Sequence, residues 1–324
     1  MKTAFVTGAT GCVGRNLINE LLRDQWKVIA MHRRSSDVSR LAGLSVELKE
    51  TDIHDLDSVR KSIPDGVDAV FHAAANVSHW PLEEKEQWKD NVLGTRHLVQ
   101  AALEKKAKRF IFTSTGATFK FSHTSKSEAA RIGCSYVRTK RLAELEVQDG
   151  IARGLDAVIT RPIIVVGAFD YGNYSQIFTH MKAGKVAVFP GSIEFCHARD
   201  VARAHISAFE KGRKGECSVL AGPEATWLEF CQKIARLLDV PPPKKQTPPA
   251  WALYALSYLL LWISYLTRKK PLITPQLLDL VVKVGGVFSA EESRKSRQEL
   301  GYQSASLDEM LKDCHEWMVR EGRL

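Results

Sequence analysis

Short apolar runs alternate with amphipathic segments over the first half of the chain. The apolar runs predict strands at residues 3–6, 27–32, 46–52, 68–75, 109–115 and 156–162. Apolar residues at helical spacing predict helices at residues 15–24, 55–63, 83–104 and 135–153. Because the strands are nearly continuous apolar runs, we expect a parallel sheet that is covered by helices on both faces. The predicted fold class is α/β, with a doubly wound parallel sheet.

The pattern changes after Pro162. Residues 167–192 are rich in glycine and show no regular period, so we expect an irregular segment there. A predicted helix, strand, proline-rich linker and mostly helical remainder follow, with the first three at residues 196–210, 217–222 and 241–249. We therefore divide the chain into a sheet domain (residues 1–166, with 193–222 returning to it) and a smaller, mostly helical lobe (residues 167–192 and 223–324).

Three glycines stand between the first predicted strand and the first predicted helix. Gly8, Gly11 and Gly14 are three residues apart in the sequence TGATGCVG, residues 7–14. Glycine lets the backbone turn tightly and approach a pyrophosphate, whose charge is stabilised at a helix N-terminus. In this context the spacing predicts a dinucleotide site on a Rossmann-type sheet, and the smaller lobe would then bind the substrate. The alternative is a glycine-rich turn that binds no ligand.

The end of the second predicted strand bears on which dinucleotide is bound. NAD sites usually place an acidic residue there for the ribose hydroxyls, but this chain has His32 followed by Arg33 and Arg34. A guanidinium group pairs well with a 2′-phosphate, so we expect NADP rather than NAD. The alternative is that both arginines are simply solvated. Asp52, after the third strand, is a candidate contact for the adenine ring or a helix-capping residue.

Two Tyr/Lys pairs share the spacing of one helical turn, and their positions separate them. Tyr136 and Lys140 lie on the helix that follows the fifth strand, whose end carries the hydroxyl of Thr115. In a parallel sheet these positions converge at the carboxyl edge, where ligands bind. Tyr265 and Lys269 have no such strand before them. We therefore take Tyr136 and Lys140 as the catalytic candidates, and the second pair as an interfacial tyrosine beside a solvated lysine.

Charge and cysteine content indicate which classes of partner and which compartment to expect. The chain of 324 residues carries a net charge of +9 and an isoelectric point near 9.2, which favours anionic partners. Its basic residues are scattered and no nucleic-acid-binding motif is present, so we do not expect nucleic acid. Six dispersed cysteines and histidines without ligand spacing predict no metal site and a reducing, cytoplasmic compartment. The first strand begins at Thr3, so we expect no secretory leader.

Residues 250–267 form an uncharged segment of 18 residues, which as a helix would be about 27 Å long. Lys244 and Lys245 precede it, and basic residues 268–270 follow it. Three interpretations compete. The segment is a buried lid helix over an apolar substrate site, a helix that lies on a membrane surface, or a spanning helix. The last is the weakest, because the segment is at the short limit and contains two serines.

Several short motifs occur in a fixed order. TGxxGxxG is followed by the arginine after the second strand, and then by TD (51–52), HAAA (72–75), NVLGT (91–95), FTST (112–115), YxxxK (136–140) and RP (161–162). Together they resemble an extended short-chain dehydrogenase/reductase of the NAD-dependent epimerase/dehydratase superfamily. The nearest branches are dihydroflavonol reductase-like and 3β-hydroxysteroid dehydrogenase-like enzymes. The resemblance covers nearly the whole chain.

The resemblance implies roles for particular residues. Tyr136 would donate a proton to a substrate carbonyl oxygen, which Thr115 would also hydrogen-bond. Lys140 would hold the nicotinamide ribose and lower the pKa of the tyrosine. Asn91 would either position Lys140 through water or brace the backbone. The implied cofactor contacts are Gly8, Thr10, Gly11, Cys12, Val13, Gly14, Arg33, Arg34, Asp52, Ile53, Ala73, Ala74, Ala75, Tyr136, Lys140 and Pro162.

The predicted function is the reduction of a ketone or aldehyde of a hydrophobic, lipid-like substrate by NADPH. By their positions after the fourth and sixth strands, the candidate substrate contacts are Ser78, His79, Tyr171, Asn173 and Tyr174. The alternatives are NAD(P)-dependent 3β-hydroxysteroid-dehydrogenase-like oxidation, a nucleotide-sugar epimerase or dehydratase, and a non-catalytic cofactor-binding protein on a membrane. A homodimer, and contact with the inner membrane surface through residues 250–270, stay open.

Overall fold

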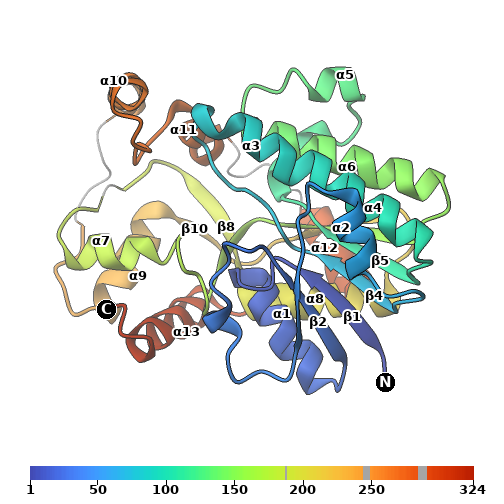
Figure 1. Cartoon of the computed structure of the whole chain (residues 1–324). Coiled ribbons are helices and arrows are strands. Elements are labelled where there is room, and N and C mark those ends of the chain that lie inside the picture. Colours follow the sequence, from blue (N-terminus) through green and yellow to red (C-terminus); the bar gives the residue numbers. More distant parts are fainter. Residues whose placement is uncertain (187, 244–248, 284–289) are drawn as a thin grey trace.

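The sheet at the centre of the molecule has seven strands in the order β3-β2-β1-β4-β5-β6-β9 (Figure 1). The computed structural model describes residues 1–186, 188–243, 249–283 and 290–324. All neighbouring strands of this sheet pair in parallel. The strand order reverses between β1 and β4, and such a switch point is where sheets of this type bind ligands. The predicted α/β fold with a doubly wound parallel sheet is confirmed.

The strands begin and end close to the predicted apolar runs. Their bounds are β1 Thr3–Thr7, β2 Lys27–His32, β3 Glu47–Glu50, β4 Ala69–His72, β5 Arg109–Thr113, β6 Ala157–Pro162 and β9 Cys217–Leu220. The register aligns their carboxyl ends, since Thr7 pairs with His72 and His72 pairs with Phe112. The residues that follow these strands therefore share one edge of the sheet.

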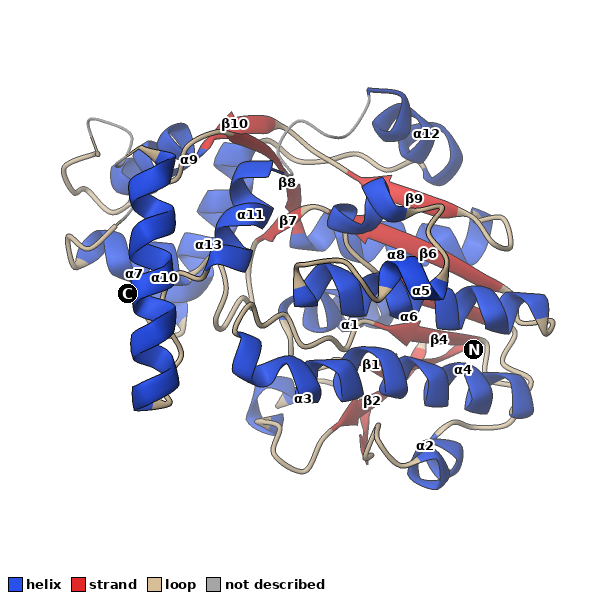
Figure 2. Ribbon diagram, turned by 90° about the horizontal axis from the view of Figure 1, so that it is seen from above, coloured by secondary structure: helices blue, strands red, loops and turns tan. Residues whose placement is uncertain are grey.

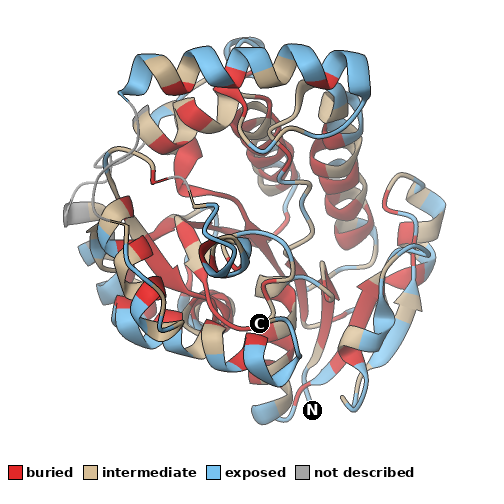
Figure 3. Cartoon of the chain, turned by 90° about the vertical axis from the view of Figure 1, so that its left-hand side faces the viewer, coloured by how far each residue is buried: buried red, intermediate tan, exposed pale blue. Residues whose placement is uncertain are grey.

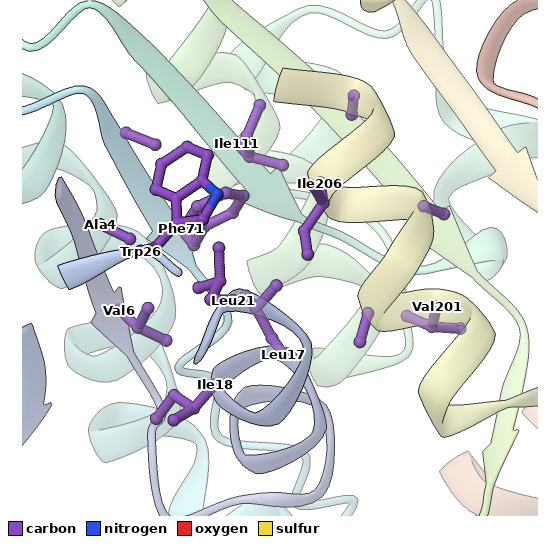
Figure 4. Close-up of a cluster of buried hydrophobic side chains, with 14 of the residues drawn as sticks. Ala4, Val6, Leu17, Ile18, Leu21, Trp26, Phe71, Ile111, Val201 and Ile206 are labelled. Carbon is purple, nitrogen blue, oxygen red and sulfur yellow. The ribbon is translucent and has the colours of Figure 1, made fainter. Parts of the chain in front are cut away.

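Helices cover both faces of the sheet. On one face lie α1 (Cys12–Arg23) and α8 (Ala198–Lys211), and on the other lie α2 (Leu56–Ser62), α4 (Gly94–Glu104) and α6 (Ser135–Ala152). Leu17 of α1, Phe71 of β4 and Val201 of α8 belong to one buried cluster (Figure 4). Phe5 and Phe110 belong to the cluster on the opposite face. Burying one such side chain stabilises the fold by roughly 1.5–3 kcal/mol, so these two clusters hold the layers together.

A π turn divides the long helix that the sequence predicts at residues 83–104. The 3-10 turn η2 (Pro81–Glu83) and helix α3 (Glu84–Trp88) lead into the π-helical turn η3 (Lys89–Leu93), and α4 continues from there. A π turn inside an α-helix inserts an extra residue and often occurs at functional sites. Here the turn contains Asn91, whose side chain bonds the loop after β4.

The second half of the chain adds a smaller sheet with its own helices. Its elements are β7 (Ile164–Val166), β8 (Ser192–His197) and β10 (Glu224–Thr226) in the order β10-β8-β7, with α7 (Gln176–Lys182), α9 (Trp227–Leu237) and α13 (Leu307–Arg320) packed beside them. The prediction of an irregular segment at 167–192 is wrong for α7. The helix predicted from residue 196 begins at Ala198 and follows β8. The sequences of α7 (QIFTHMK) and β8 (SIEFCH) mix polar and apolar residues, so neither stands out as a continuous apolar run.

The other α-helices of the described residues are α5 (Lys126–Ala129), α10 (Ala250–Thr267), α11 (Pro275–Lys283) and α12 (Ala290–Leu300). α10 has the bounds of the predicted segment and lies at the side of the molecule, beside α11 (Figure 2). Only 17% of its residues are buried, so the interpretation of a buried lid helix is wrong. Lys244 and Lys245, in the predicted linker, lie outside the described residues.

One carboxylate inside the sheet domain is fully enclosed. Glu144 of α6 accepts hydrogen bonds from Arg161 of β6 (Nε 2.8 Å, Nη2 2.9 Å) and from Arg141, one turn earlier (3.0 Å). Its Oε1 also accepts from the hydroxyls of Ser114 (2.6 Å) and Thr118 (2.7 Å). Burial alone would raise the pKa of Glu144, but the bonds and charge of Arg161 outweigh it and hold the pKa below its usual range. The carboxylate therefore fixes α6 against β6 and the segment after β5.

We expect Glu144→Gln to lower the free energy of unfolding by about 3–5 kcal/mol, because it leaves two buried guanidinium groups without their counter-charge. Urea unfolding followed by circular dichroism measures this. Glu104→Gln is the matched control, since Glu104 also receives a two-bond contact from an arginine, Arg60, but on the surface. Exposed pairs contribute little, so the control should unfold close to the wild type. Equal shifts for the two variants would contradict the assignment.

Candidate active site

The loop between β1 and α1 has the geometry of a dinucleotide cradle. Gly8 has φ +69°, and a methyl group there would lie 2.7 Å from the backbone nitrogen of Ala74 and 2.9 Å from the carbonyl oxygen of Ala73. At Gly14 a methyl group would lie 2.2 Å from the carbonyl oxygen of Gly8. Gly11 is the N-cap of α1 and gives its first turn no side-chain hydrogen bond. The cradle and the uncapped helix N-terminus suit a pyrophosphate.

A chain of hydrogen bonds fixes the floor of this loop. His72 Nδ1 lies 2.8 Å from the hydroxyl of Thr7, and its Nε2 lies 2.9 Å from the hydroxyl of Thr95. Thr95 donates to the carbonyl oxygen of Asn91 (2.6 Å), and Thr7 accepts from the backbone of Ala74 (3.1 Å). Burial, and then the charge of Lys140, lower the pKa of His72 well below its usual value, so the ring is neutral. The chain joins the glycine loop to the π turn.

The two arginines after β2 are exposed and have no ion-pair partner among the described residues. The first acid after them, Asp37, pairs with Arg40 (3.3 Å) and accepts a bond from the backbone of Ser39 (3.2 Å). Both guanidinium groups, Arg33 and Arg34, are therefore available to an anion at the end of β2.

Asp52 lies in a turn and does not cap a helix. Its carboxylate accepts a bond from the backbone of His54 (2.9 Å), whereas the N-cap of α2 is Asp55. The helix-capping interpretation of Asp52 is wrong for this reason. Its side chain is exposed at the same edge of the sheet as the two arginines, which leaves a contact with the adenine ring as the remaining prediction.

The three catalytic candidates meet at the carboxyl end of β5. The Thr115 hydroxyl is within hydrogen-bonding reach of the Tyr136 phenol and opposes the rise in its pKa. Lys140 donates to the carbonyl oxygen of Thr113 (2.7 Å), and its ammonium group lies 4.3 Å from the ring centroid of Phe112. Burial lowers the pKa of Lys140 to about 7, while the charge of Glu144 acts in the opposite direction.

We expect Lys140 to lower the pKa of Tyr136, but in the structure of the chain the pKa of Tyr136 is raised instead. Burial raises the pKa of Tyr136 to about 12, and Thr115 is the group that opposes this. The Lys140 ammonium is turned toward the end of β5 and the ring of Phe112. Tyr136 is therefore held in its neutral, proton-donating form at physiological pH.

Asn91 braces the backbone, which was one of its two expected roles. Its amide donates to the carbonyl oxygen of Asn76 (2.9 Å) and to the hydroxyl of Thr139 on α6 (3.0 Å), and it accepts from the backbone of Asn76 (2.8 Å). The loop after β4 is thereby tied to the helix that carries Tyr136.

Two of the five substrate-side candidates lie beside Tyr136. The ring of His79 meets the ring of Tyr136 edge-on at 5.4 Å, and burial lowers the pKa of His79 to about 4. The pKa of Tyr174 is raised by burial and also by the nearby Tyr136. Nδ1 of His79 is buried and has no hydrogen-bond partner among the described residues. A neutral imidazole and a second phenol therefore lie near Tyr136.

The other three candidates have different partners. Ser78 is buried and bonds the backbone of Trp80 (3.2 Å), which shapes the loop after β4. The ring of Tyr171 lies 3.8 Å from the guanidinium carbon of Arg40 and so belongs to the side of the glycine loop. Asn173 is exposed, and its backbone donates to Asp170 (2.8 Å).

The remaining predicted cofactor contacts lie on the same edge of the sheet. Ala75 is exposed after β4, and Pro162 ends β6. Thr10, Cys12 and Val13 line the start of α1, where Cys12 Sγ lies 3.6 Å from a carbonyl oxygen of the second lobe, that of Ala168. The side chain of Ile53 is buried against α4, and its carbonyl oxygen lies 3.1 Å from Nδ1 of His97.

Several residues of the site could not be identified from the sequence. Glu144, Arg141 and Arg161 resemble ordinary surface charges in a helix and at a strand end, yet all three are buried. Trp80 donates to the hydroxyl of Ser264 on α10 (3.0 Å), a contact 184 residues apart in the sequence. The only available signal was the RP motif at the end of β6, which contains Arg161.

The similarity of the chain to known proteins agrees with the dinucleotide cradle described above. The model of the NAD dependent epimerase/dehydratase family matches residues 4–221, which is most of the chain. The chain belongs to this family. The prediction of an NAD(P)-dependent enzyme with the extended short-chain dehydrogenase/reductase fold is thereby confirmed.

Similar proteins span the whole chain. "Sterol demethylase protein B" of Methylococcus capsulatus is 32% identical over 99% of this chain and 100% of its own length. A 4-hydroxy-2-methyl-3-oxo-4-farnesyl-3,4-dihydroquinoline-1-oxide ketoreductase of Stigmatella aurantiaca is 26% identical and covers 93% of this chain and 92% of its own. The crystal structure of gox2253 superposes with a TM-score of 0.83 at 28% identity, over 100% of both chains.

We expect Gly8→Ala to weaken NADPH binding at least tenfold, because the new methyl group would overlap the backbone of Ala73 and Ala74. Gly43→Ala is the matched control. Gly43 also has a positive φ (+76°), but a methyl group there meets no atom within 4 Å. Both variants bear the cost of a left-handed alanine, about 1–2 kcal/mol, and only the first should lose affinity in a nicotinamide-fluorescence titration. Comparable losses in both would rule out the cradle.

Proposed function

We propose that this protein is an NADPH-dependent reductase that transfers a hydride to a ketone or aldehyde of a hydrophobic substrate, with Tyr136 as the general acid. The observation that carries the proposal is the neutral Tyr136 at the carboxyl edge of the sheet, beside Thr115 and the buried Lys140. The cofactor would lie across the glycine loop, and residues 167–192 and 223–324 would form the substrate side.

The side chains have complementary tasks in this reaction. When bound, the cofactor supplies a hydride to the carbonyl carbon. Tyr136 donates its phenolic proton to the carbonyl oxygen, and Thr115 donates a hydrogen bond that stabilises the negative charge on either oxygen. Lys140, which is buried one helical turn from Tyr136, would hold the nicotinamide ribose, and the tyrosinate would regain its proton from solvent. The carbonyl is reduced to an alcohol, and NADPH is oxidised to NADP⁺.

The preference for NADPH rests on charge at the end of β2. Arg33 and Arg34 are exposed, and the carboxylate that could hold ribose hydroxyls, Asp37, is paired with Arg40. A doubly charged 2′-phosphate would gain charge-assisted bonds from a guanidinium group there. An unphosphorylated ribose would find no free carboxylate immediately after the strand.

The residues around Tyr136 support the proposal of a hydrophobic substrate. His79 is neutral, Tyr174 is protonated, and Tyr174 in turn stacks on Trp227 at 6.2 Å. The similar ketoreductase of Stigmatella aurantiaca acts, by its name, on a farnesylated quinoline. A nucleotide-sugar substrate would require phosphate-binding side chains on this side of the site, and none of these three residues is cationic.

We expect Tyr136→Phe to lower kcat by about 10²–10⁴-fold, the range that a general acid contributes. The affinity for NADPH should stay within twofold of the wild type, because the variant removes one oxygen atom. Steady-state reduction of a panel of apolar ketones, with a parallel fluorescence titration of NADPH, measures both. Turnover that survives the substitution would contradict the proposed mechanism.

We expect Arg33→Ala to weaken NADPH binding about tenfold or more, since a hydrogen bond to a charged group contributes about 1.5–3 kcal/mol. NADH binding should not change, because NADH has no 2′-phosphate. Lys214→Ala is the control: Lys214 is also exposed, but it precedes β9 and so lies at the opposite edge of the sheet. A loss that is equal for both cofactors, or a wild-type preference for NADH, would overturn the assignment of NADPH.

A further inference from the structure

The exposed side of helix α10 is strongly apolar, whereas two of its three buried residues are polar. Its buried positions include two serines, Ser257 and Ser264, which are 0% and 2% exposed. Both hydroxyls donate to carbonyl oxygens one turn earlier, those of Tyr254 (2.8 Å) and Leu261 (2.6 Å). The opposite side is aromatic and aliphatic, and Trp262 is 61% exposed. A helix that packs in water places its apolar side inward, so the outer environment of α10 is apolar.

The exposed side is large for a protein surface. It consists of Trp251, Leu256, Tyr258, Leu259, Trp262, Ile263, Tyr265 and Leu266. Its four aromatic side chains alone expose on the order of 350–600 Å², which already matches the largest patch on a typical monomer, about 300–600 Å². Figure 3 shows α10 as the long helix at the top, with this side turned away from the rest of the molecule. A surface of this kind marks an interaction site.

α10 lies flat along the protein. Within the described residues it is the one helix long and apolar enough to cross a membrane, which by itself is weak evidence of membrane contact. Buried positions occur near both ends, at Leu253 and Ser264. Tyr254 donates to Asp279 of α11 (2.8 Å), and Trp80 donates to Ser264 (3.0 Å). Because one side is held by the protein along its length, the helix cannot be surrounded by lipid as a spanning helix is.

The charge beside this face identifies its partner. Arg268 and Lys269 follow the helix, are exposed, and form no ion pair within the described residues. Residues 250–270 contain no acidic residue, so a second copy of the same face would offer these cations no counter-charge. Anionic lipid headgroups do, and tryptophan and tyrosine favour the depth of the headgroups. We propose that α10 is an in-plane anchor that lies on an anionic membrane surface, with its aromatic side in the lipid.

The anchor also adjoins the catalytic region. Trp80, which bonds Ser264, directly follows His79, and the ring of His79 meets the ring of Tyr136. Glu83, three residues further on, pairs with Lys270 (3.3 Å). Docking of α10 therefore brings the loop after β4 and Tyr136 to the lipid interface, where a lipid-soluble carbonyl compound can reach the site from the bilayer. This last step rests on the proposed function, whereas the anchor does not.

The test is flotation of the full-length protein, without cofactor or substrate, with two kinds of vesicle. One contains phosphatidylcholine with 30 mol% phosphatidylglycerol, as a chosen composition of roughly bacterial charge, and the other contains phosphatidylcholine alone. We expect binding to the anionic vesicles and a partition coefficient at least tenfold lower for the double variant Trp262→Gln, Leu266→Gln. The control double variant Leu48→Gln, Val319→Gln removes two similarly exposed apolar side chains from other surfaces and should bind as the wild type does.

The cations are tested separately. Arg268→Gln with Lys269→Gln should lower the partition coefficient on anionic vesicles about tenfold or more, given about 1 kcal/mol for each basic residue near such a surface. Binding of this variant to neutral vesicles should match that of the wild type. High salt should reproduce the same loss in the wild type, since it screens exposed charges.

Other outcomes decide against the anchor. A protein that stays unbound by both vesicles overturns it. A second outcome also overturns the anchor: the wild type is a dimer in solution, and the double variant Trp262→Gln, Leu266→Gln is a monomer. The apolar face would then be an interface between two copies of the chain. Failure of the proposed function looks different: the protein would bind vesicles but reduce no carbonyl compound. If both hold, Trp262→Gln, Leu266→Gln should slow reduction of a vesicle-dissolved ketone and leave reduction of a small water-soluble aldehyde unchanged.

Discussion

The geometry of the catalytic edge depends on one buried carboxylate, that of Glu144. It is 0% exposed and receives bonds from two arginines and two hydroxyls. One arginine, Arg161, comes from β6, and one hydroxyl belongs to Ser114, next to Thr115. If one charge of such a cluster is removed, the buried charges that remain lose their counter-charge and keep the free-energy cost of burial. The cluster therefore stabilises the fold as one unit. The same helix presents Lys140 one turn earlier and Tyr136 two turns earlier, and the carboxylate therefore sets their distance from the end of β5.

A second, neutral network sets the position of the cofactor loop against that helix. It runs from Thr7 through His72 and Thr95 to the π turn, where Asn91 bonds both the loop after β4 and Thr139 of α6. The neutral histidine is essential, since a ring with two donors could not accept the proton of the Thr7 hydroxyl. The charged cluster around Glu144 and the neutral hydrogen-bond network through His72 therefore both contact α6. The dinucleotide cradle and Tyr136 belong to one rigid frame, which is what hydride transfer between two bound molecules requires.

The sequence predicted those parts whose signal is local. The strands were found because parallel strands are continuous apolar runs, and Tyr136 was separated from Tyr265 because it follows a strand. Glu144 and Arg141 could not be found, because charges three residues apart on a helix look the same whether they face solvent or the interior. α7 (QIFTHMK) and β8 (SIEFCH) were not predicted because polar residues interrupt both, so neither is a continuous apolar run. The bounds of α10 were correct, but its orientation was not predictable, since a segment apolar on all sides does not reveal which side packs on the protein.

The exposed apolar side of α10 connects these constraints to the proposed chemistry. Under the proposed function, an apolar substrate would reach the site along the surface that α10 provides. The buried serines let α10 sit close to the loop after β4, because small side chains occupy little space. In the proposed anchor, the aromatic side would face lipid, and the net charge of +9 would favour an anionic surface. The loop after β4 therefore contacts both parts of the molecule: Asn76 bonds Asn91, whose amide bonds α6, and Trp80 bonds Ser264 of α10.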